Sequence, residues 1–176
     1  MLFYVALGIN VILILALTYV ILAFLLPPFM GAPFVPSSRV AVEKMLELAQ
    51  PQPGERMVDL GSGDGRIVMA FAEKGIEAHG YEINPTLVLM SRLAIRGRGL
   101  RGKAHVHWRS LMGVDFSKFD IVVIYGLPRI MKNLESRLQK DLPPGGRVIS
   151  NTFSFQNWPS AKKEDKVFLY KKMDSA

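Results

Sequence analysis

The alternation of apolar and polar residues divides this chain into two unlike parts. Residues 2–26 contain no charged side chain, and the first charged residue is Arg39. After Arg39, short apolar runs alternate with amphipathic segments, and Pro or Gly separates many of them. The pattern predicts one long apolar helix, followed by a folded domain of alternating strands and helices.

The N-terminal segment is long enough to cross a lipid bilayer, since a span takes about 20 apolar residues. No Lys or Arg precedes it and Pro27-Pro28 follows it, unlike the basic start and small-residue cleavage site of a secretory signal. We predict a retained single-pass transmembrane anchor over residues 1–27, with a cleaved signal or a buried core helix as alternatives. Because basic residues favour the cytoplasmic side of a span, the domain is expected on that side.

The segment 28–37 is rich in Pro and is typical of a linker. Beyond it, apolar runs predict strands, and apolar residues at helical spacing predict helices. The expected strands are residues 56–60, 77–83, 104–110, 119–126, 147–153 and 166–173. The expected helices are residues 37–50 with Ser38 as cap, 65–74, 85–99 and 129–142. This order favours an α/β fold in which a parallel sheet carries helices on both faces.

Composition narrows the chemistry. The 176 residues suit one domain, and the absence of cysteine excludes disulfides, thiolate metal sites and a cysteine nucleophile. The net charge of +7 suits an anionic membrane surface or nucleic acid. The basic run 96–103 lacks interleaved aromatic residues, which leaves lipid contact, RNA binding and a solvated helix end as readings. His105 and His107 share a strand face without an evident third ligand, so no metal is expected.

Three glycines, Gly61, Gly63 and Gly65, stand between the first strand and its helix. Glycine there permits a tight turn and a close approach of a ligand to the backbone, and the following helix N-terminus suits an anionic group. A dinucleotide fingerprint G-x-G-x-x-G does not fit, because the third glycine comes one position early and Arg66 takes its place. Asp59 precedes the loop, and a carboxylate suits a ligand with an ammonium group better than a pyrophosphate.

Glu82 ends the second predicted strand, about 20 residues after the loop, where a carboxylate can accept hydrogen bonds from ribose hydroxyls. This feature supports nucleoside binding without choosing the cofactor. The pattern D-L-G-S-G-D-G, residues 59–65, resembles the first motif of the seven-strand methyltransferases that use S-adenosyl-L-methionine. The resemblance implies that Asp59 serves the amino end of the methionine part.

Longer segments narrow the resemblance. In order, they are PFVPSSRVAVEKML, VDLGSGDGRIVMAFAEKG, GYEINPTLVLMSRLAIR, IVVIYGLPRIMKNLESRLQKDLPPGGRVIS and FSFQNWP. With the apolar N-terminus, they resemble the membrane-anchored lysine methyltransferases that modify the ATP synthase c-subunit or the adenine nucleotide translocase. The resemblance implies a Rossmann-like seven-strand methyltransferase sheet with a shortened C-terminus over residues 38–176, behind the N-terminal transmembrane helix.

The resemblance also assigns roles to individual residues. Residues 34–37, including Phe34, Pro36 and Ser37, would form a pre-motif over the cofactor or substrate entrance. The methionine part would be held by Asp59, Gly61, Ser62, Gly63 and Gly65. The ribose would be held by Glu82, and the adenine would lie against Ile83 and Asn84, near Ser110 and Leu111. The residues that leave the fourth strand beside the reactive methyl would be Tyr125, Gly126, Leu127 and Pro128.

Two features depart from the family pattern. Ser110 stands where the family usually has an acid near the adenine amino group. The closing segments are reduced to KVFLYKKM, so the acceptor side is expected to be more open or completed by a partner.

The chemistry of methyl transfer requires position and a desolvated site more than a dedicated base, because burial lowers the pKa of a lysine acceptor. Tyr125 and Phe153 are candidate walls of the acceptor channel or ordinary core residues. Asp64 and Arg66 form either part of the site or an ion pair at the helix start. No Asn-Pro-Pro-Tyr type of motif follows the fourth strand, which disfavours base and amide acceptors.

We predict a methyltransferase that uses S-adenosyl-L-methionine to methylate lysine in a small membrane protein, with neither nucleic acid nor metal as partner. The setting would be a cytoplasmic membrane face, or a mitochondrial membrane in a eukaryote. The alternatives are methylation of a lipid or small apolar metabolite, a cofactor-binding scaffold without turnover, and an NAD-dependent enzyme.

Overall fold

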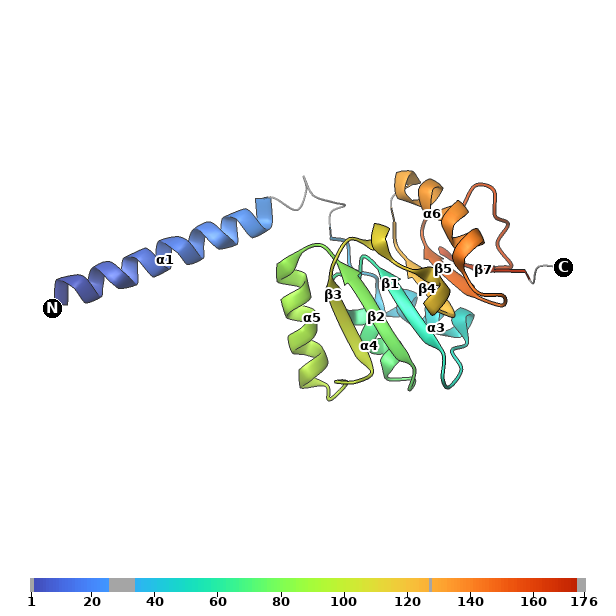
Figure 1. Cartoon of the computed structure of the whole chain (residues 1–176), viewed down its shortest axis with the longest axis horizontal. Coiled ribbons are helices and arrows are strands. Elements are labelled where there is room, and N and C mark those ends of the chain that lie inside the picture. The colour runs from blue at the N-terminus through green and yellow to red at the C-terminus, as the bar shows by residue number, and fades with distance from the viewer. Residues whose placement is uncertain (1, 26–33, 127, 174–176) are drawn as a thin grey trace. The chain divides into compact units, whose positions relative to one another are not determined.

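The computed structural model describes residues 2–25, 34–126 and 128–173, in two units that comprise residues 1–33 and 34–176 (Figure 1). The first unit contains the helix α1, Leu2–Leu25, as the apolar pattern predicted. Its stretch Phe3–Leu22 has a mean hydropathy of 2.6 and is long and apolar enough to cross a membrane. Within it the amide of Asn10 donates to the carbonyl of Ala6 at 2.9 Å, so this polar group is satisfied inside the helix.

The second unit is built around a seven-stranded sheet in the order β3-β2-β1-β4-β5-β7-β6. The first five strands pair in parallel. Their bounds are β1 Arg56–Leu60, β2 Glu77–Glu82, β3 Ala104–Trp108, β4 Ile121–Ile124 and β5 Arg147–Asn151. The last two strands, β6 Lys162–Glu164 and β7 Val167–Lys171, form an antiparallel hairpin, and β7 pairs antiparallel with β5.

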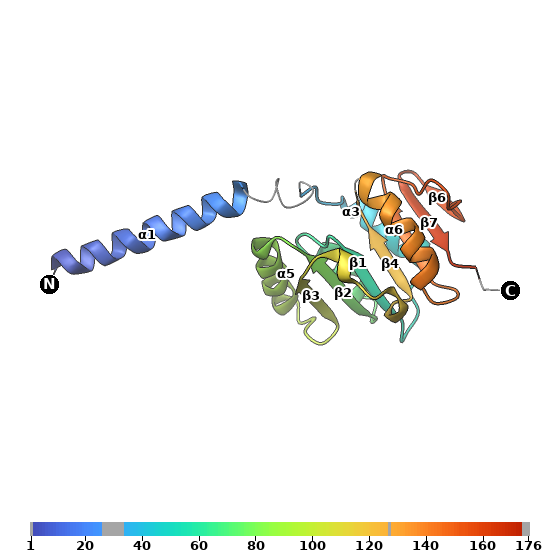
Figure 2. The same cartoon turned by 45° about the horizontal axis from the view of Figure 1, so that its top comes forward.

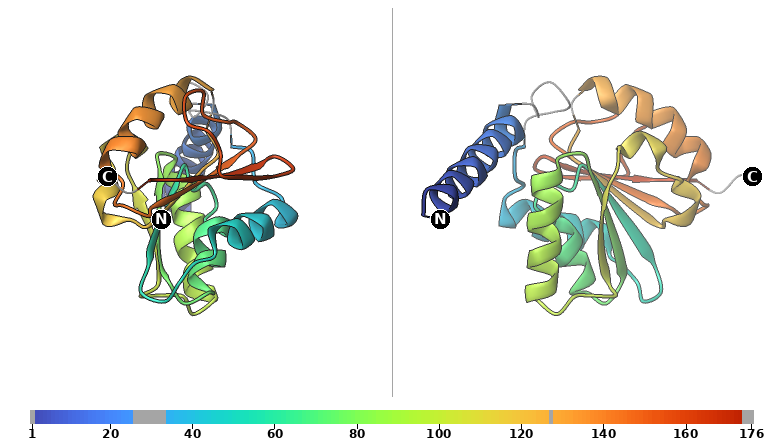
Figure 3. Two further views of the ribbon diagram at one scale, coloured as in Figure 1. Left: turned by 90° about the vertical axis from the view of Figure 1, so that its right-hand side faces the viewer. Right: turned by 60° about the vertical axis from the view of Figure 1, so that its left-hand side comes forward.

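Helices cover both faces of this sheet, as expected, but unequally (Figures 2 and 3). The helices α3 Arg39–Ala49, α4 Arg66–Ala72 and α5 Pro85–Gly97 pack on one face. The helix α6, Pro128–Asp141, packs on the other, together with the short 3-10 turn η2, Phe116–Lys118. A second such turn, η1, spans Leu111–Gly113.

The helix starts follow from local chemistry. The hydroxyl of Ser38 accepts a hydrogen bond from the amide of Ala41 at 3.2 Å, which satisfies one of the free donors of the first turn of α3. The side chain of Asn84 caps α5 in the same way, and Pro85 fixes the first helical position. Both caps place the preceding loop at the same edge of the sheet, which is the edge where the parallel strands end.

The expectation of a parallel sheet was wrong at its end. The strand β6 was not predicted, because its three residues are two lysines and a glutamate, which give no apolar pattern. The segment that follows it turns at Asp165, which has a φ of 50°, and only two residues separate β6 from β7. A connection this short permits only an antiparallel hairpin, because a parallel crossover takes a dozen or more residues.

We expect α6 to be the main source of stability on its face of the sheet. Leu134 is fully buried on α6, and Leu134→Ala should lower the free energy of unfolding by about 2–5 kcal/mol through lost burial and a cavity. Chemical denaturation of the full chain in detergent measures this. The matched variant Gln139→Ala alters an exposed position of the same helix and should change stability by less than about 0.5 kcal/mol. Equal effects of the two variants would contradict the packing described.

Candidate functional site

The glycine loop joins β1 to α4 at the carboxyl ends of the parallel strands, which is where open α/β sheets bind ligands. Gly61, Gly63 and Gly65 have φ angles of 87°, 54° and 78°, a region that side chains with a Cβ rarely adopt. The loop is anchored to β2 because the amide of Gly61 donates to the carbonyl of Tyr81 at 2.9 Å. The glycines are therefore required by the backbone path itself.

The carboxylate of Glu82 holds this loop in place. One oxygen accepts from the amide of Gly63 at 2.9 Å, and the other accepts from the amide of Asn84 at 2.8 Å. The side chain is 9 % exposed, so both bonds lie away from bulk water. Glu82 thus brings the end of β2 and the start of α5 against the glycine loop.

Asp59 and Ser62 are buried polar residues next to this bond. Atom Oδ2 of Asp59 and the hydroxyl of Ser62 have no hydrogen-bond partner among the described residues. Burial raises the pKa of Asp59 to about 8, and the charges of Glu82 and Asp64 contribute. A cationic ligand group beside Asp59 would lower this raised pKa, because an opposite charge favours the ionised carboxylate.

The segment 34–38, which we call the strap, crosses the site. The ring of Phe34 lies over Gly63, where a Cβ atom would come within 2.4 Å of it. The guanidinium of Arg66 donates to the carbonyl of Ser37 at 2.8 Å and also forms a two-pronged pair with Asp64. Burial would raise the pKa of Asp64, but the bonds from Arg66 hold it below its usual value. The ion pair at the helix start therefore also holds the strap.

The far side of the loop is formed by the ends of β2 and β3. The indole of Trp108 donates to the carbonyl of Ile83 at 3.0 Å and remains 64 % exposed. Ser110 caps η1 by accepting from the amide of Met112, and Leu111 lies partly buried against the core of the α6 face. An exposed flat ring thus stands next to the residues expected at an adenine.

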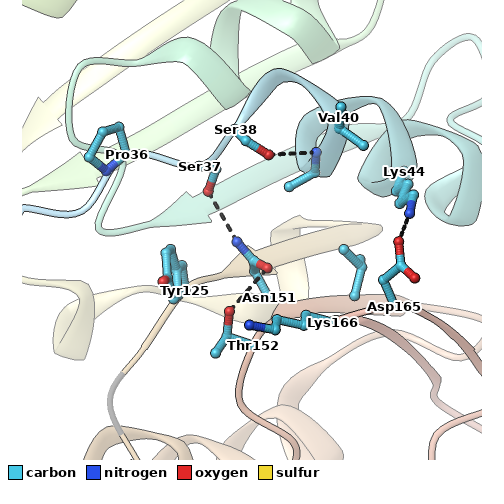
Figure 4. Close-up of a pocket in the computed structure, with 12 residues that line it drawn as sticks. Pro36, Ser37, Ser38, Val40, Lys44, Tyr125, Asn151, Thr152, Asp165 and Lys166 are labelled. Atoms are coloured by element: carbon cyan, nitrogen blue, oxygen red, sulfur yellow. Dashed lines mark hydrogen bonds and ion pairs between the residues drawn. The ribbon is translucent and has the colours of Figure 1, made fainter.

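A cavity of about 650 Å³ opens on the other side of the strap (Figure 4). Its lining comes from the strap and α3, the ends of β4 and β5, and the β6–β7 turn; it comprises Pro36, Ser37, Ser38, Val40, Ala41, Lys44, Tyr125, Asn151, Thr152, Asp165, Lys166 and Val167. The amide of Asn151 donates to the hydroxyl of Ser37 at 3.3 Å, so the strap is bonded on both sides.

Aromatic and charged groups surround this cavity. Tyr125, at the exit of β4, lines the cavity. Phe153, the other expected wall residue, is not among the lining residues; it packs against the core of the α6 face, with its ring centroid 6.3 Å from that of Tyr125. Thr152 adopts a φ of 70°, which is unusual for a β-branched residue and often marks a functional position. Lys44 pairs with Asp165 across the rim.

His79, His105 and His107 gather on the β2–β3 part of the sheet face that carries α6. Nδ1 of His79 lies 3.0 Å from Nε2 of His107, and the rings stack. Burial lowers the pKa of His79 and of His107. The described residues contain no group of three or more His, Cys, Asp or Glu that could hold a metal ion.

Comparison with known proteins decides the family. The family model described as the ANTKMT methyltransferase domain matches residues 59–162, which is more than half of the chain. The chain belongs to this methyltransferase family. The matched region contains the glycine loop, Glu82 and the exits of β4 and β5.

Curated relatives of this chain are named as lysine N-methyltransferases. The human ATP synthase c-subunit lysine N-methyltransferase is 42% identical over 126 residues, which cover 72% of this chain and 54% of the relative. The mouse adenine nucleotide translocase lysine N-methyltransferase is 38% identical, over 86% of this chain and 71% of the relative. A protein-lysine N-methyltransferase of Saccharolobus islandicus is 33% identical, over 72% and 80%. The chain spans about half the length of the ATP synthase c-subunit methyltransferases it matches.

Solved structures support the cofactor. An RNA methyltransferase from Salinibacter ruber, crystallised with S-adenosyl-L-homocysteine, is 31% identical with a TM-score of 0.76 and covers 81% of this chain and 96% of its own. A methyltransferase from Thiobacillus denitrificans shares the fold at 21% identity and a TM-score of 0.57. S-adenosyl-L-methionine is the cofactor of this family and fold. The unpartnered Asp59 and the Cβ-free loop fit its cationic methionine end.

The structure brings most of the expected site residues together. The expected residues on the loop side are Phe34, Asp59, Gly61, Ser62, Gly63, Gly65, Glu82, Ile83 and Asn84, and those on the cavity side are Pro36, Ser37 and Tyr125. Leu127 lies outside the described residues. Sequence reasoning missed Asn151 and Trp108. Trp108 could have been recognised as an aromatic residue at a strand end, whereas nothing local distinguishes Asn151.

The pKa of Asp59 predicts a pH dependence of cofactor binding. Because its folded pKa is about 8, the carboxyl is mostly protonated below that pH and must lose its proton to pair with a cationic ligand. Affinity for S-adenosyl-L-methionine should rise with pH, by at most about tenfold per unit below pH 8, and flatten above it. Calorimetry across pH 6.5–9, a range chosen around that pKa, measures this.

The control for this measurement is Asp59→Asn, which is nearly isosteric and does not titrate. It should bind the cofactor more weakly and lose the part of the pH slope that Asp59 supplies. An identical slope in both proteins would assign the titration to the cofactor or to another group.

Proposed function

We propose that this protein is an S-adenosyl-L-methionine-dependent protein-lysine N-methyltransferase that acts on a membrane-associated protein. The observation that carries the proposal is the position of the strap between the glycine loop and the cavity. Arg66 donates a hydrogen bond to the strap from the side of the loop, and Asn151 donates one from the side of the cavity. A cofactor in the loop and an acceptor in the cavity would thus meet at one segment. The lysine specificity of the curated relatives supports the choice of acceptor.

The proposed reaction is an in-line displacement in which the lysine nitrogen takes the methyl group and the electron pair of the broken bond remains on sulfur. The bound cofactor supplies the activated methyl group. Tyr125 would line the entrance, with Phe153 beside it, and the two rings would exclude water, which lowers the pKa of the acceptor ammonium so that it can lose its proton. We assign no general base. The contribution of the chain is orientation and desolvation.

The membrane setting of the proposal rests on α1. Its stretch Phe3–Leu22 has the length and the apolar composition that a membrane span requires. Two groups of relatives are named for membrane-protein substrates, the ATP synthase c-subunit and the adenine nucleotide translocase. A single-pass anchor would raise the effective concentration of the enzyme beside such a substrate.

A second candidate is RNA methylation. It is favoured by the Salinibacter ruber relative, which is described as an RNA methyltransferase, and by the basic run 96–103. Methylation of a lipid or an apolar metabolite is a third, since α1 would serve it equally. The experiment below separates these acceptors.

Transfer of a labelled methyl group tests the proposal. Full-length protein in detergent or vesicles would be incubated with labelled S-adenosyl-L-methionine and with membranes and RNA from cells that lack it. We expect label on lysine of a small membrane protein, and loss of that label with Glu82→Ala, which removes the bond to Gly63 of the glycine loop and the bond to Asn84 at the start of α5. Label in RNA or in the lipid fraction would contradict lysine specificity. Absence of any label despite cofactor binding would contradict catalysis.

A further prediction concerns Phe153, the aromatic residue beside Tyr125. Phe153→Ala should lower the turnover of lysine methylation, by roughly tenfold to a hundredfold if desolvation and orientation matter, while cofactor affinity stays within about twofold. The matched variant Phe168→Ala removes a partly buried aromatic residue of β7 that packs against the same core as Phe153. Phe153 differs from it in standing beside Tyr125, which lines the cavity. Equal losses of turnover from the two variants would reduce Phe153 to a packing residue.

A further inference from the structure

Three large apolar side chains stand exposed on the outer side of α5. Leu89, Met90 and Leu93 are 57%, 54% and 59% exposed, and their spacing places them on one stripe of the helix. The opposite side of α5 packs on the sheet through Val88 and Ile95. Figure 1 shows α5 at the margin of the folded unit. The exposure of the three side chains places the stripe on the solvent side of the helix. We call these three residues the α5 stripe.

The chain segment that carries the α5 stripe has Lys and Arg as its only charged residues besides histidine. The stretch from Ile83 to Val114 contains no Asp or Glu, and its six basic residues are Arg92, Arg96, Arg98, Arg101, Lys103 and Arg109. All six are exposed. Of these six, only Arg98 pairs with a carboxylate of the described residues, that of Glu73. The guanidinium of Arg92 donates to the carbonyl of Val106. An apolar stripe with a basic rim is the pattern of helices that lie in the headgroup region of an anionic bilayer.

The point where the chain enters the folded unit lies beside α5. Gly63 is contacted by the ring of Phe34 and accepts, through its carbonyl, a hydrogen bond from Ser91 of α5 at 2.9 Å. Phe34 and Val35 are themselves 47% and 57% exposed. Eight residues separate Leu25 from Phe34, a length of chain that reaches about 30 Å at most. An anchor in the membrane would therefore keep α5 within reach of the membrane surface.

We infer that the α5 stripe and its basic rim bind the surface of an anionic lipid bilayer, an inference that rests on the proposed anchoring by α1. Other occupants fit less well. A second copy would bring like charges together around a two-fold axis. RNA would gain from the arginines but not from the aliphatic stripe, since single strands bind by stacking on aromatic rings.

The cysteine-free chain permits a direct test. Leu93→Cys places a single thiol on the stripe, and Gln139→Cys places one on the exposed side of α6, on the other face of the sheet. Each full-length variant would carry an environment-sensitive fluorophore and be reconstituted in vesicles of phosphatidylcholine, with or without phosphatidylserine. Some of the vesicles would contain a lipid-borne quencher.

We expect the label at position 93 to shift its emission to the blue and to be quenched in anionic vesicles only. The label at position 139 should do neither. Raising salt from about 0.1 M to 1 M, which shortens the screening length from about 10 Å to 3 Å, should reverse the shift. Arg96→Gln with Arg101→Gln should weaken docking by about fivefold per charge, and Lys132→Gln with Lys140→Gln on α6 should not.

Two outcomes overturn the inference. In one, the label at 93 behaves like that at 139 although the protein floats with the vesicles. In the other, the label is shielded equally in neutral vesicles, which removes the role of the basic rim, or without lipid, which identifies a protein contact. Flotation itself reports the anchor, and methyl transfer reports the enzyme. Failure of the proposed function is therefore distinguished from failure of lipid docking.

Discussion

The carboxylate of Glu82 is the interaction on which the site depends. It binds the amide of Gly63 with one oxygen and that of Asn84 with the other, while buried. Charge-assisted hydrogen bonds in such surroundings are stronger than those between neutral groups. They fix a loop whose glycines have no side chains of their own to hold it, and they bring β2 and α5 to the same point. The same carboxylate also contributes to the high pKa of Asp59.

A second constraint is the strap, which lies between the glycine loop and the cavity. Phe34 lies on the loop, and Ser37 receives bonds from Arg66 and Asn151 on its two sides. Any movement of one side must therefore be accommodated by the other. In the proposed reaction this arrangement would bring the methyl donor and the acceptor lysine together. The strap is also the first described segment of the folded unit, and eight residues separate it from α1 in the sequence.

The two faces of the sheet are covered unequally. Three helices bury one face, whereas α6 and short turns cover the β4–β5 side of the other. Stacked histidines take the β2–β3 part of that second face. The helix α5 is the outermost element of the three-helix face, and its outer stripe is apolar within a basic rim.

The sequence by itself determined the apolar helix, the five parallel strands of the seven-stranded sheet, and the helix starts at Ser38 and Pro85. It also determined the glycine loop, with Asp59 before it and Glu82 after it. Periodicity, caps and positive φ angles are local, so a single chain segment encodes them. Only the tertiary structure decided the β6–β7 hairpin, the bond between Asn151 and Ser37, and the place of Arg66 under the strap. The two bonds to Ser37 join residues far apart in the chain, and no local pattern specifies which distant group a side chain will meet. The hairpin is local, but the polar residues of β6 give no apolar pattern that would predict a strand.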